Sequence, residues 1–109
     1  MWAEKGNVIV EIKTEAAAGT LESSDVLVQA APNPGKGLEI DLESVVLTTF
    51  GEQIRATVKE VCAEMGVADA KLVLKDKGAI DCVIRARVQA ALCRASETKY
   101  NWEGEDKNG

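Results

Sequence analysis

The feature that most constrains the fold of this chain is a change in the spacing of its apolar residues. In residues 38–43, apolar and acidic side chains alternate, which predicts a strand with one buried face. In residues 50–65, apolar side chains recur every three or four positions, which predicts an amphipathic helix that Gly66 is suited to end. Residues 70–75 then predict another strand. This order favours a right-handed crossover between parallel strands.

A hairpin and a second helix complete the predicted fold. Residues 8–19 and 26–30 are strand-like and flank a polar stretch, and residues 79–95 have helical spacing. We therefore expect an α+β fold, a small two-layer sandwich of about four strands, in which an N-terminal hairpin and a β-α-β unit are covered by two helices. The expected buried stripes of the helices are Phe50, Ile54, Val58, Val61 and Met65, and Ile80, Ile84, Val88, Ala91 and Leu92.

Length and charge limit the class of protein. The 109 residues suit one domain, which we place at residues 11–95 between a flexible extension (1–10) and a flexible acidic tail (96–109). The net charge of -5 argues against a nucleic-acid partner, which calls for a basic surface. No apolar run approaches the roughly 20 residues that cross a bilayer, and the N-terminus lacks the pattern of a signal peptide. We therefore expect no membrane partner and a cytoplasmic location.

Cysteine and histidine content excludes several kinds of site. Cys62, Cys82 and Cys93 are an odd number without a close pair, so neither a disulfide nor a zinc site is expected. We expect free thiols that pack as small hydrophobic side chains. The chain has no histidine, which removes the commonest general base and metal ligand. We predict no metal site and no catalytic residue of that kind.

The polar stretch of residues 19–26 is the candidate functional site. Ser23, Ser24 and Asp25 are typical of turns and caps, where their side chains bond nearby backbone amides. Glu22 and Asp25 would work as an acid and base only in a pocket that gives them unequal environments, and nothing in the sequence indicates one. The residues alone therefore favour a turn. They do not distinguish the two serine hydroxyls.

Arginines on the two predicted helices are the other candidates for binding. Arg87 and Arg94 lie seven residues apart and share a helix face that could bind phosphate or carboxylate. Arg55 and Arg85 lie on exposed faces of their helices. A solvated charged surface is the alternative interpretation for all four.

Three separated segments, residues 18–26, 50–57 and 76–87, together resemble the citrate lyase acyl carrier protein (gamma chain) family. The resemblance runs from about Glu11 to Ala95, so residues 11–95 would be an acyl carrier domain. It implies that a phosphoribosyl-dephospho-coenzyme A group is joined through a phosphodiester to the serine after Gly-Thr-Leu-Glu, which here is Ser23. Ser24 is the neighbouring alternative. The chain would then be a phosphoprotein.

The resemblance also implies a function and partners. The thiol of the group would hold acetyl and citryl thioesters during cleavage of citrate to acetate and oxaloacetate. Separate transferase (alpha) and lyase (beta) subunits would perform the chemistry, and a prosthetic-group transferase would modify the serine, so this chain would be a non-catalytic carrier. Glu22 and Asp25 become recognition or turn residues, and Arg55, Arg85, Arg87 and Arg94 candidates for phosphate or partner contacts. The alternatives are a malonate decarboxylase-type acyl carrier and an unmodified interaction or assembly domain.

Overall fold

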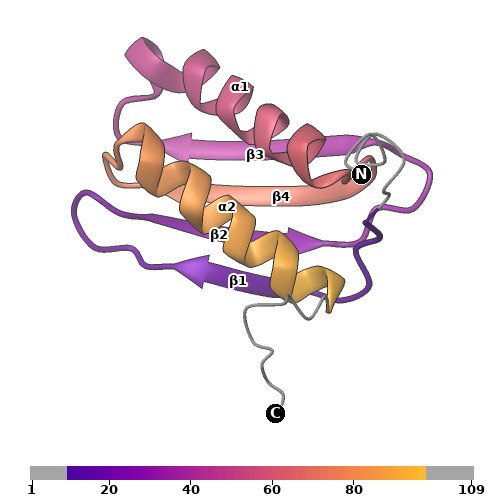
Figure 1. Ribbon diagram of the computed structural model, residues 1–109. Coiled ribbons are helices and arrows are strands. Elements are labelled where there is room, and N and C mark those ends of the chain that lie inside the picture. The colour runs from indigo at the N-terminus through magenta and orange to yellow at the C-terminus, as the bar shows by residue number, and fades with distance from the viewer. Residues whose placement is uncertain (1–9, 98–109) are drawn as a thin grey trace.

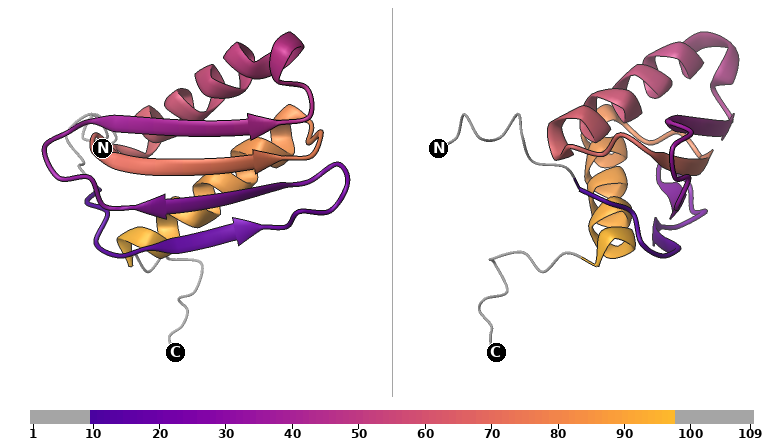
Figure 2. Two further views of the ribbon diagram at one scale, coloured as in Figure 1. Left: turned by 180° about the vertical axis from the view of Figure 1, so that it is seen from behind. Right: turned by 90° about the vertical axis from the view of Figure 1, so that its right-hand side faces the viewer.

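The computed structural model describes residues 10–97, which form a four-stranded sheet and two helices (Figure 1). Both helices pack on the same face of the sheet, and no described segment covers the other face (Figure 2). The predicted α+β sandwich, with its N-terminal hairpin and β-α-β unit, is confirmed. In chain order the elements are β1 (Ala16–Gly19), β2 (Val26–Ala31), β3 (Leu38–Ser44), α1 (Leu47–Met65), β4 (Ala70–Asp76) and α2 (Asp81–Ser96).

Strand directions bring three connections to one end of the sheet. The strand order is β1-β2-β4-β3, in which β2 is antiparallel to both of its neighbours and β3 is parallel to β4. Strands β1, β3 and β4 therefore run the same way, and the segments that follow them, residues 20–25, 45–46 and 77–80, meet at the left of Figure 1. We call this the serine end. The opposite end, with residues 32–37 and 66–69, is the proline end.

The core lies between the sheet and the helices. Val26 and Val28 of β2 and Leu72 and Leu74 of β4 are completely buried, and they alternate with more exposed residues as a half-covered sheet requires. Each such side chain contributes roughly 1.5–3 kcal/mol by leaving water. The helices contribute buried side chains at the predicted spacing, including Ile54, Val58, Val61, Ile84, Val88, Ala91 and Leu92.

The strand predicted for residues 8–19 is wrong over residues 10–15, and its residues 8 and 9 lie outside the described range. β1 is confined to Ala16–Gly19, and residues 10–15 instead cross the C-terminal ends of both helices. Val10 N donates to Gly66 O at 2.9 Å, and the amides of Lys13 and Thr14 donate to Ala95 O at 2.9 and 3.0 Å. Helix C-termini have carbonyls without intrahelical partners, so this segment satisfies some of them. The alanines form a strand despite their low propensity, because tertiary packing overrides it.

Two residues predicted in the buried stripes are exposed. Phe50 is 47% exposed and Ile80 is 66% exposed. The reason is their position at the serine end, since Phe50 lies in the first turn of α1 and Ile80 is the N-cap of α2. α2 thus begins two residues later than predicted, at Asp81. Met65, also predicted in the stripe, is half-buried.

The cysteines are free but only one is buried. Burial raises the pKa of the Cys62 thiol to about 11, which makes it inert. Cys82 is exposed, so its predicted packing is wrong, and Cys93 is half-buried.

Within residues 10–97, neither helix is long and apolar enough to cross a membrane, and no cluster of potential metal ligands occurs. The predicted extension and tail, residues 1–10 and 96–109, lie outside the described range except for Val10, Ser96 and Glu97.

Candidate functional site

Ser23 lies at the apex of the turn that joins β1 to β2. The turn is closed by a hydrogen bond of 3.1 Å from Asp25 N to Glu22 O. Ser24, the third residue of the turn, has a φ of 68°, which is a costly backbone conformation for a residue other than glycine. Glu22, Ser23 and Ser24 are all exposed.

The turn is fastened to the loop that follows β4. Ser24 N donates to Lys77 O at 2.8 Å, and Lys77 N donates to Asp25 O at 2.9 Å. These reciprocal backbone bonds extend the pairing of β2 with β4 beyond the sheet. They explain how Ser24 is held in its strained conformation.

The loop after β4 is itself held by a buried carboxylate. Asp76 is 2% exposed, and its Oδ2 accepts hydrogen bonds from Ser44 Oγ at 2.8 Å and Gly78 N at 3.1 Å. Its Oδ1 accepts from Ala79 N at 3.0 Å. A buried charge requires several such donors. Asp76 therefore ties together β3, β4 and the start of α2 beneath the Ser23 turn.

Asp25 joins the turn to α2. Arg87 donates from Nε to Oδ1 and from Nη2 to Oδ2 of Asp25, both at 3.0 Å. Thr20 Oγ1 and Val26 N also donate to this carboxylate, each at 2.7 Å. These bonds, with that from Arg87 the largest influence, lower the pKa of Asp25 from 3.8 to about 2. Asp25 is therefore ionised at neutral pH and has no free capacity to act as a base.

Gly19 has no room for a side chain. Its φ is +94°, and a Cβ built there would lie 1.8 Å from the carbonyl oxygen of Val26 and 3.2 Å from Cδ of Arg87. The last residue of β1 must therefore be glycine for the strands to approach as closely as they do before the turn.

The predicted arginine candidates separate into different environments. Arg87 alone reaches the Ser23 turn, whereas Arg94 Nη1 donates to Ala17 O at 2.7 Å. The two residues share a helix face but bind separate partners. Arg55 Nη1 donates to Ile40 O at 2.7 Å, and Arg85 bridges to α1 by contacts of 2.6 Å to Glu60 and 2.7 Å to Glu64.

The Ser23 hydroxyl is accessible but not activated. Among residues 10–97, the side chain of Ser23 makes no hydrogen bond, since Asp25 is already paired with Arg87 and the adjacent Glu22 carboxylate is not bonded to the hydroxyl. A hydroxyl with a pKa far above neutrality needs a general base to become a nucleophile. The turn can therefore present Ser23 to another enzyme, and its apex position leaves space for a large covalent group.

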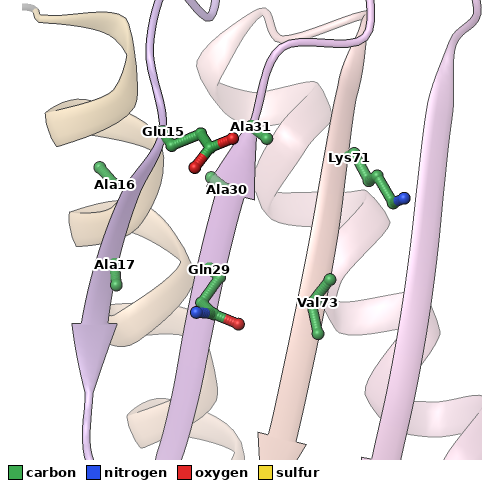
Figure 3. Close-up of a pocket in the computed structure, with 8 residues that line it drawn as sticks. All are labelled: Glu15, Ala16, Ala17, Gln29, Ala30, Ala31, Lys71 and Val73. Carbon is green, nitrogen blue, oxygen red and sulfur yellow. The ribbon is translucent and has the colours of Figure 1, made fainter.

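A separate cavity on the uncovered sheet face does not have the chemistry of an active site. It has a volume of about 390 Å³ and lies toward the proline end, where Gln29, Lys71 and Val73 contribute to its lining (Figure 3). Its charged groups are Glu15 and Lys71, and its other lining residues are mainly alanines. Its lining includes no serine, threonine or cysteine.

Sequence reasoning missed the residues that position the turn. Thr20, Asp76 and Lys77 had no assigned role beyond turn formation. Asp76 and Lys77 bond residues far apart in the chain, Ser44 and the Ser23 turn respectively, whereas Thr20 bonds Asp25 five positions away. The Asp25–Arg87 pair likewise spans 62 positions. Only the polar character of residues 76–78, which follow a strand, gave a local signal.

The chain matches one family model and several known proteins of similar sequence. The family described as "Malonate decarboxylase delta subunit (MdcD)", an acyl carrier (ACP) family, matches residues 13–95. The citrate lyase acyl carrier protein of Haemophilus influenzae (strain PittGG) is 50% identical over 94 residues, which cover 86% of this chain and 97% of that protein. The protein of the same description from Treponema denticola is 53% identical over 88 residues, covering 81% and 99%.

A solved structure shares the fold. A chain of the Pseudomonas malonate decarboxylase hetero-tetramer in complex with malonate matches with a TM-score of 0.69 at 17% identity. The match covers 81% of this chain and 90% of the other.

Proposed function

Because the chain belongs to the acyl carrier family that includes malonate decarboxylase delta subunits and citrate lyase acyl carrier proteins, we propose that it is the acyl carrier subunit of citrate lyase and that Ser23 carries its prosthetic group. The observation that supports this site best is the exposed, unbonded Ser23 hydroxyl at the apex of its turn. Hydrogen bonds hold this turn to the loop after β4 and to α2. The chain would act as a non-catalytic member of a multi-subunit complex.

The proposed group is phosphoribosyl-dephospho-coenzyme A, joined to Ser23 through a phosphodiester. When bound, it supplies a thiol that holds acetyl and citryl groups as thioesters. The residues present fit such a group, because the Ser23 oxygen is free and no described side chain covers it. The three cysteines of the chain are then not needed for acyl transfer.

The remaining residues of the turn position Ser23. Asp25 and Arg87 fix the turn against α2, and Gly19 permits the close approach of the strands. Glu22 is exposed beside Ser23, so it is our candidate for recognition by a prosthetic-group transferase. A base from that enzyme would remove the serine proton, since no group of the turn is hydrogen-bonded to the Ser23 hydroxyl. Arg87, which is 40% exposed, retains surface for a phosphate or partner.

Arg94 has a weaker case as a recognition residue. It is exposed but is bonded to β1 rather than to the Ser23 turn. We propose that it contributes to contacts with the transferase (alpha) or lyase (beta) subunit rather than to the phosphodiester. Retention of group transfer with loss of complex assembly in Arg94→Ala would support this division.

The second candidate is a malonate decarboxylase-type carrier, which the matched family description favours. The identity of 47–53% with citrate lyase carriers, against 17% with the chain from malonate decarboxylase, favours citrate. An unmodified interaction or assembly domain is the third alternative.

Mass spectrometry of the protein from a host that contains the modifying enzyme tests the proposal. We expect an added nucleotide-linked pantetheine on the Ser23 peptide, complete loss of that mass in Ser23→Ala, and its retention in Ser24→Ala. Both serines are exposed, and Ser24 has the strained φ of 68°, so misfolding would be expected in Ser24→Ala before Ser23→Ala. An unmodified Ser23, or a group that requires Ser24 instead, would contradict the assignment.

A further inference from the structure

Large apolar side chains are exposed at the same end of the molecule as Ser23. They come from all three connections at the serine end and from the first turn of α1. Their exposed fractions range from 45% to 66%. Exposed apolar side chains that form one patch mark binding surfaces, whereas single ones are normal. The residues are Leu21, Val45, Leu47, Phe50 and Ile80.

Two of these residues line a cavity between the N-terminal ends of α1 and α2. The cavity has a volume of about 330 Å³, which lies in the range of small-molecule sites. Phe50 and Ile54 form its wall on α1, and Ile80 and Ile84 form its wall on the other helix. Its polar groups include the Gln53 amide and the Asp81 carboxylate. The combination is an apolar slot with a few hydrogen-bonding groups.

The cavity adjoins the Ser23 turn. Gly78 lines it, and the preceding residue, Lys77, forms both backbone bonds to the turn, at 2.8 Å to Ser24 and 2.9 Å to Asp25. The loop from Asp76 to Ile80 therefore separates the turn from the cavity. A group attached to Ser23 therefore starts beside the loop that lines the cavity.

We propose that this cavity binds the nucleoside part of the group attached to Ser23, an inference that rests on the proposed function. Dephospho-coenzyme A has adenosine at one end and the thiol at the other. Because the thiol has to stay free, the phosphoribosyl link is on the adenosine side, so the base is the first large ring beyond Ser23. Adenine has flat apolar faces that stack on aromatic side chains, and its edge pairs with a glutamine amide. Phe50 and Gln53 offer these two contacts.

The tether makes even weak binding effective. A ligand on a short flexible link is present at an effective concentration on the order of millimolar, so a site with millimolar affinity is substantially filled. Holding the base beside α1 and α2 fixes the near part of the arm and leaves the thiol end to reach a partner. Only the part of the arm beyond the bound base is then free to move.

NMR spectroscopy of the modified and unmodified full-length protein tests this inference. We expect attachment to shift the amide resonances of Ile54, Ile80 and Ile84 as well as those next to Ser23, and we expect nuclear Overhauser effects between adenine protons and the Phe50 ring. Phe50→Ala should abolish the cavity shifts while the added mass on Ser23 persists. Leu47→Ala is the matched control, because Leu47 is exposed to a similar degree in the same helical turn, 45% against 47%, but does not line the cavity.

The outcomes separate the two proposals. A modified Ser23 with shifts confined to residues 20–25 and 77 would overturn the cavity proposal and leave the carrier function intact. The exposed apolar side chains would then be candidates for contact with a partner subunit. An unmodified Ser23 would overturn both. Ile80→Ser provides a second variant at an exposed position, so the test does not depend on how Phe50→Ala folds.

Discussion

The two ends of β4 are built differently, although an aspartate fixes a loop at each. At the proline end, Asp69 accepts one hydrogen bond, from Gly37 N at 2.8 Å, and Asn33 closes the rest of that loop by a bond of 3.1 Å to Gly37 O. At the serine end, Asp76 accepts three hydrogen bonds. The Ser23 turn above it is braced further by Asp25 and Arg87.

The difference shows which end has to keep one conformation. At the proline end, prolines and glycines shape the loop, and Gly37 makes its bonds to distant residues, with Asp69 at 2.8 Å and Ala70 at 3.0 Å. The serine end depends on contacts between segments far apart in the chain. Such cross-bracing would hold the proposed attachment serine in one geometry for the enzyme that modifies it.

Glycine substitution at the two ends should give the largest contrast. Gly19→Ala combines a positive φ with a Cβ 1.8 Å from Val26 O, so we expect a loss of about 3–4 kcal/mol in the free energy of unfolding. Gly35 has a φ of +72°, but a Cβ built there would have nothing within 4 Å. Gly35→Ala is therefore expected to lower the free energy of unfolding by about 1–2 kcal/mol. Urea denaturation measures both. Equal losses would show that the close approach at Gly19 relaxes without cost.

Removal of the two aspartates should give the next largest contrast. Asp76→Ala leaves three donors without their charged acceptor, and we expect a loss of about 2–3 kcal/mol in the free energy of unfolding. Asp69→Ala removes one bond from a half-buried site, so about 1 kcal/mol is expected. Denaturation midpoints with unchanged slopes would measure these losses. A larger effect of Asp69→Ala would reverse the comparison.

Acid should weaken the Ser23 turn in a defined range. The pKa of Asp25 is about 2 in the folded chain and 3.8 without its partners, mainly because Arg87 binds the carboxylate. The folded state therefore favours the ionised form, so this stabilisation is complete above about pH 4 and is lost as the pH falls through about 2. Carboxyl NMR titration should give the low value. Asp25→Asn should remove this part of the acid dependence; if it is unchanged, another carboxyl is responsible.

The smallest effect is expected from Arg85, which lies outside both ends. Its ion pairs with Glu60 and Glu64 link the exposed surfaces of α1 and α2. Pairs of this kind contribute little and are screened by salt. Arg85→Ala should lower the unfolding temperature slightly at low ionic strength, by an amount that shrinks in 1 M salt, and should leave group attachment to Ser23 unchanged. Slower attachment would show that Arg85 also acts in recognition.

The sequence predicted the elements better than the site. Period-two alternation in residues 38–43 and helical spacing in residues 50–65 and 79–95 identified β3, α1 and α2, because local periodicity reports which face is buried. Periodicity does not show where a helix stops being covered by the sheet, so Phe50 and Ile80 were wrongly placed in the core. The apolar residues before Ala16 fitted a strand equally well, and only the helix C-termini they cross explain their actual path.

The site depended on contacts that no local pattern contains. Residue types suggested a turn at Ser23, and the family resemblance singled out this serine. The pairing of Asp25 with Arg87 rather than with Glu22 follows from α2 lying over the hairpin. The four arginines bind separate partners for the same reason, because each binds an acceptor that the packing of the elements brings close to it.

The position of Arg94 has a consequence for self-association. β1 is an edge strand of four residues, and such edges can pair with the same strand of another molecule. Arg94 places a charged side chain against this edge and uses the carbonyl of Ala17. A second copy would have to displace the guanidinium to add a strand there. The guanidinium of Arg94 therefore opposes edge-to-edge pairing at β1, whose alanines and glycine carry no charge of their own.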